Sequence, residues 1–266
     1  MSTFLYGGNV QANGIRQHYL RYGGKGPVLI LIPGITSPAI TWGFVAERLG
    51  AKFDTYVLDV RGRGLSSTGR ELDYSADTCA DDIGAFADAL NLDSYHLMGH
   101  SMGARFAVRS AVKHPQGVNR VVLIDPPVSG PGRREYPSKL PWYVDSIRQS
   151  LIGMDAEAMR AFCATWTEEQ LQLRAEWLHT CFGPAIVRAF NDFHTVDFHQ
   201  DLPHLKAPAL LLVAGRGGVI LEEDVAEIQD LQPTIQVARV PNAGHMIPWD
   251  DFEGFFDALG DFLTQE

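Results

Sequence analysis

Two side chains far apart in the sequence, Ser101 and His245, are candidates for nucleophilic catalysis. A serine hydroxyl is a poor nucleophile until a neighbouring base takes its proton. Histidine can be that base near neutral pH, and it can return the proton to a leaving group. A buried carboxylate can fix the tautomer of the imidazole and stabilise its charged form. Such a triad would transfer an acyl group first to the serine and then to water.

The serine lies in Gly99-His100-Ser101-Met102-Gly103, which has the pattern Gly-x-Ser-x-Gly. A short apolar run over 95–98 predicts a strand before it, and helix-forming residues over 104–112 predict a helix after it. The flanking glycines allow a sharp turn because they carry no Cβ that could clash. This context predicts an exposed, nucleophilic Ser101 hydroxyl. The alternative is a glycine-rich turn without chemistry.

Among the nine histidines, His245 is the candidate for the base. It follows a predicted strand over 234–240 and precedes an amphipathic helix over 252–263. His100, beside the serine, is expected to shape the pocket wall, and His96 is expected to be a strand residue.

The third member of the triad is expected to be Asp125, which directly follows an apolar run over 121–124. In open α/β sheets, functional groups gather at the carboxyl ends of strands. The later strand predicted over 209–215 leads into a Gly-Arg-Gly-Gly sequence that offers no acid. Glu223 and Asp224 are the alternatives, although they resemble the first turn of a helix, where the dipole favours acidic residues.

The elements that must position these residues alternate between strands and helices up to residue 127. An Asn13-Gly14 pair predicts a hairpin that joins strands over 9–12 and 15–22. The β-branched run over 28–32 is typical of a central parallel strand that is buried on both faces. The other predicted elements of this part are a strand over 55–58 and helices over 41–49 and 75–90.

Residues 128–200 interrupt this alternation. Helices are predicted over 142–152, 156–164, 168–180 and 186–193, and the segment is rich in aromatic residues. From the residues alone, it is interpreted as an inserted bundle packed by its own aromatic side chains.

Composition restricts the possible partners. The chain has 266 residues, of which 45% are hydrophobic and 20% charged, as in ordinary soluble globular proteins. Its net charge of −10 argues against nucleic acid or an anionic membrane surface as a partner. An anionic substrate would therefore need a local basic group inside a pocket.

The three cysteines, Cys79, Cys163 and Cys181, fit neither a disulfide framework nor a zinc site. They are expected to be buried thiols in a reducing compartment. The first residues show no signal peptide, and no apolar stretch is long enough to span a bilayer. A cytoplasmic location is therefore expected, and no metal site is predicted.

These motifs resemble the α/β-hydrolase superfamily over nearly the whole chain. The resemblance implies a mostly parallel eight-stranded sheet flanked by helices. It also implies a core made of residues 1–127 and 201–266, with residues 128–200 as an inserted helical cap.

The resemblance further implies an oxyanion hole made by the backbone N–H groups of Ile35 and Met102. In this superfamily a His-Gly pair usually follows the strand before the first of these residues, and Pro33-Gly34 stands here instead. The departure is tolerable because only the backbone of Ile35 is needed, although a plain Pro-Gly turn is the alternative. The Asp-x-Arg-Gly-x-Gly-x-Ser turn at 59–66 is interpreted as structural.

More narrowly, the chain resembles amide hydrolases of bacterial nicotinate breakdown, which implies a small carboxylic acid bearing an N-formyl amide as substrate. The implied deformylation passes through an acyl-enzyme and needs no cofactor. The pocket candidates are His100, Trp142, Arg133 and His194. Other cationic candidates near the cap are Arg134, Lys139, Arg148 and Arg188. The sequence does not determine the oligomeric state.

Two other functions are kept open. The first is another serine hydrolase, acting on an ester, a lactone or a carbon–carbon bond of a ring-cleavage product. The second is a non-catalytic receptor for a small molecule, against which the paired Ser101 and His245 argue. A dehalogenase is disfavoured because those relatives carry aspartate at the nucleophile position.

Overall fold

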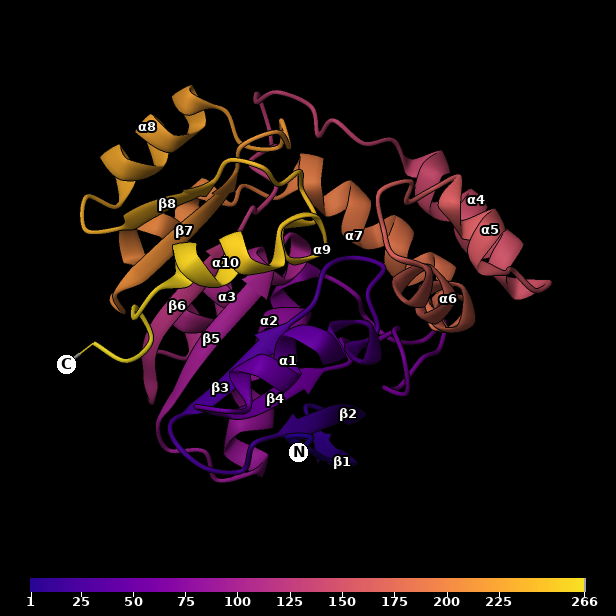
Figure 1. Cartoon of the computed structure of the whole chain (residues 1–266). Helices are drawn as coiled ribbons and strands as arrows, with labels where there is room; N and C mark the ends of the chain where they lie inside the picture. Colours follow the sequence, from indigo (N-terminus) through magenta and orange to yellow (C-terminus); the bar gives the residue numbers. More distant parts are fainter. Residues whose placement is uncertain (266) are drawn as a thin grey trace.

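The computed structural model describes residues 1–265 and contains a sheet with the strand order β1-β2-β4-β3-β5-β6-β7-β8 (Figure 1). The strands are β1 (Phe4–Ala12), β2 (Ile15–Tyr22), β3 (Val28–Ile32), β4 (Asp54–Leu58), β5 (Tyr95–His100), β6 (Val118–Ile124), β7 (Ala209–Ala214) and β8 (Gln236–Val240). Strand β2 pairs in the antiparallel sense with β1 and with β4, and the remaining pairs of neighbouring strands are parallel. The predicted eight-stranded, mostly parallel sheet is confirmed.

Helices cover both faces of this sheet: α1 (Gly43–Leu49) and α10 (Phe252–Leu259) lie on one face, and α2 (Ala76–Ala89) and α3 (Met102–Lys113) on the other (Figure 1). Near the carboxyl end of the chain are α8 (Glu222–Leu231) and the single turn α9 (Ile247–Asp250). The apolar run of β3 is buried as predicted, within a sheet that has helices on both faces (Figure 1).

The N-terminal hairpin forms where the sequence predicts it. Asn13 and Gly14 both have positive φ, 47° and 74°, as a two-residue turn between twisted strands requires. Strand β1 begins at Phe4, earlier than the predicted start at residue 9, because pairing with β2 extends it along an exposed edge. Strand β8 begins at Gln236, two residues later than predicted.

Between β6 and β7 the chain forms the helical insert, which contains α4 (Leu140–Leu151), α5 (Ala156–Arg160), α6 (Glu168–Trp177) and α7 (Gly183–Thr195). The insert lies beside one edge of the sheet (Figure 1). Helix α5 ends at Arg160 instead of the predicted residue 164. The following residues form tight turns, and Phe162, Cys163 and Trp166 in this stretch line a cavity.

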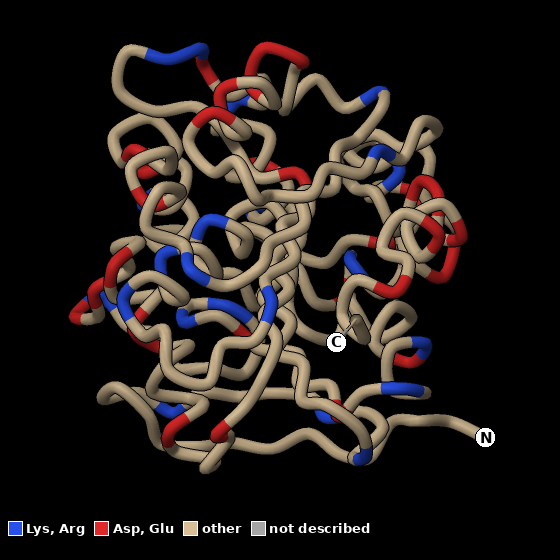
Figure 2. The backbone as a smooth tube through the Cα atoms, turned by 90° about the vertical axis from the view of Figure 1, so that its left-hand side faces the viewer, with Lys and Arg blue, Asp and Glu red and all other residues tan. Residues whose placement is uncertain are grey.

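Acidic and basic residues are interspersed over the backbone in Figure 2. Over residues 1–265, no helix is both long enough and apolar enough to cross a membrane. The three cysteines are free and buried, as expected from their spacing.

Candidate active site

Ser101 lies at the junction of β5 and α3 with φ 54° and ψ −119°, a conformation that is strained for a residue with a side chain. The flanking glycines are needed because the chain passes so closely here. A Cβ on Gly99 would lie 2.3 Å from the carbonyl oxygen of Gly103, and one on Gly103 would lie 2.1 Å from that of Ile32. The predicted strand-turn-helix therefore forms around the serine.

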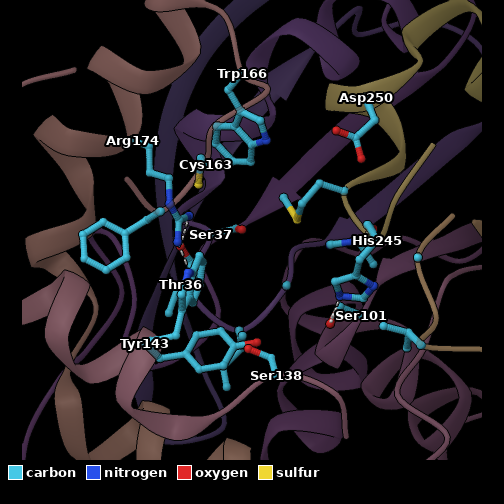
Figure 3. A pocket seen from close by; sticks show the side chains of 18 of the residues that line it. Thr36, Ser37, Ser101, Ser138, Tyr143, Cys163, Trp166, Arg174, His245 and Asp250 are labelled. Atoms are coloured by element: carbon cyan, nitrogen blue, oxygen red, sulfur yellow. Dashed lines mark hydrogen bonds between the residues drawn. The ribbon is translucent and has the colours of Figure 1, made fainter. Parts of the chain in front are cut away.

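A continuous chain of hydrogen bonds joins the three residues of the predicted triad. The Ser101 hydroxyl lies 3.0 Å from Nε2 of His245, and Nδ1 of His245 lies 2.7 Å from Oδ2 of Asp125 (Figure 3 shows the Ser101–His245 contact). Asp125 is fully buried, and its other oxygen accepts a hydrogen bond from the backbone N–H of Ala214. This geometry fits a base that is oriented by a carboxylate.

The two alternative acids for the triad, Glu223 and Asp224, are not the partners of His245. Glu223 and Asp224 are in the first turn of α8, as the sequence suggests. Asp224 accepts hydrogen bonds from the backbone N–H of Leu221 and from Arg134. Only Asp125 among the three candidate acids contacts His245.

The two residues predicted for the oxyanion hole lie at the rim of the same sheet. Ile35 follows β3, and Met102 is the first residue of α3. Arg63 contacts both residues. Its Nε donates to the carbonyl oxygen of Ile35 at 3.1 Å, and its Nη2 lies 3.3 Å from the sulfur of Met102. The Arg63 guanidinium is buried, and this burial lowers its pKa.

The 59–66 turn has the structural role that the sequence suggests. Asp59 accepts hydrogen bonds from the backbone N–H groups of Ala39 and Leu65. Arg61 forms two hydrogen bonds with Asp82 of α2. The turn thus fixes the loop after β3 to the layer of helices behind it.

A cavity of about 440 Å³ opens at Ser101 and His245, a size typical of small-ligand sites. Its walls come from the sheet rim and from the helical insert, including Thr36, Trp142, Cys163 and Trp166. Among residues 1–265, no cluster of three or more histidine, cysteine or acidic residues could hold a metal ion.

Arg174 of α6 is the cation in this cavity, and sequence reasoning missed it. It is only 3% exposed, and its guanidinium carbon lies within 6 Å of the ring centroids of both Trp142 and Trp166. It donates to the carbonyl oxygen and hydroxyl of Thr36, both at 3.0 Å, while its Nε has no partner within the described residues. In Figure 3 it lies across the cavity from Ser101 and His245.

The structure corrects two of the four pocket candidates. Trp142 and His100 line the cavity, whereas Arg133 and His194 do not. Arg133 forms two hydrogen bonds with Glu227 of α8, and Nδ1 of His194 lies 3.2 Å from the carbonyl oxygen of Phe190 within α7. Their own partners hold these side chains away from the reactive serine.

The remaining cationic candidates are also outside the cavity. Arg134 pairs with Asp224, Lys139 with Glu135, Arg148 with Asp145 and Arg188 with Asp192. These pairs are at least partly exposed, so the four residues act as surface charges. No sequence signal distinguishes Arg174 from them, because only packing shows which arginine of the insert is buried.

His100 lines the cavity next to the triad as an uncharged imidazole. Its Nε2 donates to the carbonyl oxygen of His245 at 2.9 Å, and burial together with the nearby His245 ring lowers the pKa of His100 to about 3. A Cβ on Gly34 would lie 2.9 Å from the His100 ring, so glycine is required there.

Tyr136, in the segment before α4, is a second residue that the sequence does not single out. Its hydroxyl lies 3.2 Å from Nε2 of His245 and 3.5 Å from the hydroxyl of Tyr143. It is 3% exposed, and burial holds its pKa well above the ordinary value for tyrosine.

Known proteins resemble this chain over most of its length. A family model described as the alpha/beta hydrolase fold matches residues 27–252. The chain is 74% identical over 263 residues to an N-formylmaleamate deformylase of Pseudomonas putida, covering 99% of this chain and 98% of that protein.

Solved structures show the same similarity. The chain resembles a crystal structure of an N-formylmaleamic acid deformylase variant from Pseudomonas putida S16, with a TM-score of 0.93 and 55% identity over 96% of this chain and 100% of that one. An E-2-(acetamidomethylene)succinate hydrolase structure matches with a TM-score of 0.80 over 98% of this chain and 100% of that one. At 24% identity the second match supports the fold alone.

Proposed function

Because this chain belongs to the α/β hydrolase fold family, we propose that it hydrolyses N-formylmaleamate to maleamate and formate. The hydrogen-bonded chain of Ser101, His245 and Asp125 carries this proposal. The near full-length similarity to a deformylase supports the choice of substrate.

The first step forms an ester between the formyl group and Ser101. His245 takes the hydroxyl proton as the oxygen attacks the formyl carbon, and Asp125 stabilises the resulting imidazolium. The formyl oxygen gains negative charge, and the backbone N–H groups of Ile35, after β3, and Met102, the first residue of α3, would donate to it.

The tetrahedral intermediate then breaks at the carbon–nitrogen bond. The electron pair of this bond goes to nitrogen, and His245 returns its proton there, so that maleamate leaves. A water molecule attacks the formyl-serine with His245 again as the base. Formate is released and Ser101 regains its proton. Apart from this water molecule, the steps use only side chains and backbone groups of the chain.

Arg174 is the proposed anchor for the substrate carboxylate. An arginine has five N–H donors, and two of these serve Thr36, so others can pair with a carboxylate. The residue is buried within the cavity, where such a pair is screened less than at the surface. A protein with net charge −10 needs a local cation of this kind to hold an anion.

Residues 128–200 are proposed to be a cap, over a core formed by residues 1–127 and 201–266. The cavity walls support this division, since Arg174, Trp142 and Trp166 come from the insert while Ser101 and His245 come from the core. The cap would contribute substrate selection and the core would contribute chemistry.

A formate-release assay on the purified protein tests the function. The wild type should release formate and maleamate in equal amounts from N-formylmaleamate, and Ser101→Ala should release neither at a measurable rate. Ser110→Ala is the matched control, because Ser110 is a buried serine of α3, the helix that follows Ser101, and does not line the cavity. Hydrolysis of nitrophenyl esters without any formate release would contradict the proposal and favour another serine hydrolase.

A further inference from the structure

Two hydroxyl groups face the same nitrogen of the proposed base. Nε2 of His245 lies 3.0 Å from the Ser101 hydroxyl and 3.2 Å from the Tyr136 hydroxyl. When Nδ1 carries the proton that is donated to Asp125, Nε2 has one lone pair and accepts well from one donor at a time. Tyr136 therefore competes with the nucleophile in the resting enzyme.

The surroundings of Tyr136 hold its hydroxyl in place. Its ring packs against Phe193 with centroids 5.0 Å apart, and the Tyr143 hydroxyl donates to its oxygen at 3.5 Å. Burial raises its pKa, so the hydroxyl keeps its proton and serves as a donor. A buried donor that faces the reactive centre requires an acceptor during the reaction.

We propose that Tyr136 is a further catalytic residue, whose hydroxyl donates a hydrogen bond to the carbonyl oxygen of the departing amide. This role rests on the proposed function. In N-formylmaleamate the scissile nitrogen is also bonded to the maleamate carbonyl, so a departing group bound at Nε2 of His245 would place that oxygen near Tyr136. The imidazole and the phenol would then contact adjacent positions of one planar amide.

The electron balance shows what this contact contributes. As the bond between the formyl carbon and nitrogen breaks, its electron pair moves to nitrogen and is delocalised onto the maleamate oxygen. His245 supplies the proton that nitrogen gains. Tyr136 keeps its own proton and stabilises the oxygen through a hydrogen bond that strengthens as charge develops. No other reactant is needed.

Substrate binding would also remove the competition at His245. When the hydroxyl of Tyr136 turns to the substrate oxygen, the lone pair of Nε2 is left to Ser101. The base is therefore fully available only for a substrate that carries an acceptor beyond the scissile nitrogen. Reagents without such an acceptor would react with Ser101 while Tyr136 still competes.

The test compares Tyr136→Phe with the wild type in two reactions. For N-formylmaleamate, kcat should fall roughly 10- to 100-fold while KM changes less than about threefold, because the lost bond is strongest in the transition state. For labelling of Ser101 by a fluorophosphonate, whose leaving fluoride needs no such donor, the rate should stay equal or rise. Tyr143→Phe should show the same pattern with a smaller loss.

Tyr74→Phe is the matched control, because Tyr74 is a buried tyrosine whose hydroxyl donates to Gly69 outside the cavity. It should match the wild type in both reactions. Equal slowing of labelling and deformylation in Tyr136→Phe would show a merely structural role and overturn the proposal, as would an unchanged kcat. A wild type without formate release would overturn the proposed function and this inference together.

Discussion

Arg174 of the helical insert donates hydrogen bonds to both the carbonyl oxygen and the hydroxyl of Thr36, each at 3.0 Å. Thr36 directly follows Ile35, which is proposed to contribute to the oxyanion hole. The residue proposed to bind the substrate carboxylate is therefore joined to the loop proposed to bind the reacting oxygen. Carboxylate binding and transition-state stabilisation are expected to depend on one side chain.

Replacing Arg174 by glutamine should raise KM for N-formylmaleamate by roughly 10- to 100-fold, since a charge-assisted hydrogen bond is lost. A smaller fall in kcat should accompany it through Thr36. Steady-state kinetics measure both effects. Arg148→Gln, on an exposed arginine of α4, is the control and should match the wild type. Unchanged KM in Arg174→Gln would place the carboxylate elsewhere.

Replacing Asp125 by asparagine should lower kcat by about 10⁴-fold, because the amide cannot hold His245 in the tautomer that accepts the serine proton. The fold should persist, since the new side chain has nearly the same shape. Asp224→Asn is the control, and activity near that of the wild type is expected there. If the control lost activity and Asp125→Asn kept it, the assignment of the acid would be wrong.

Replacing Arg63 by methionine should both destabilise the protein and slow catalysis. The change leaves the buried carbonyl oxygens of Ile35 and Arg61 without the donor they now have, at a cost of about 1–3 kcal/mol each. Denaturant unfolding measures the first effect and kcat measures the second. A stable variant with unchanged kcat would show that the loop after β3 keeps its geometry without Arg63.

Acid should destabilise the fold through His96. Burial, with a smaller effect of Arg120, lowers the pKa of this histidine to about 4, whereas an unfolded histidine titrates near 6.5. Between these values the unfolded chain binds more protons, so the stabilisation is complete above about pH 6.5 and is lost as the pH falls toward 4. The titration of this one histidine changes the free energy of unfolding by at most about 1.4 kcal/mol for each pH unit.

The free energy of unfolding at pH 7 and pH 5 measures this effect. His96→Gln should lose less stability between the two values than the wild type does. His204→Gln provides the control because it changes an exposed side chain and no buried group. An equal loss in His96→Gln and the wild type would show that other groups determine the acid sensitivity.

The sequence by itself predicted the parallel sheet, the sharp turn around Ser101, and His245 and Asp125 as the partners of this serine, with Glu223 and Asp224 as alternatives to the aspartate. These signals are local: an apolar strand, a Gly-x-Ser-x-Gly turn and a helix follow one another in the chain. The carboxyl ends of parallel strands meet at one edge, so residues that follow β5, β6 and β8 must converge. Topology thus brings the three side chains together.

Only the tertiary structure decided which residues of the insert reach them. Arg174 and Arg148 both lie on helices predicted from the sequence and look alike there, yet Arg174 is buried near two indole rings and Arg148 is exposed. Tyr136 lies in a segment without regular structure, where no periodicity indicates the direction of a side chain. Burial of a single long side chain depends on the packing of whole helices against the sheet rim, and local sequence patterns do not record that packing.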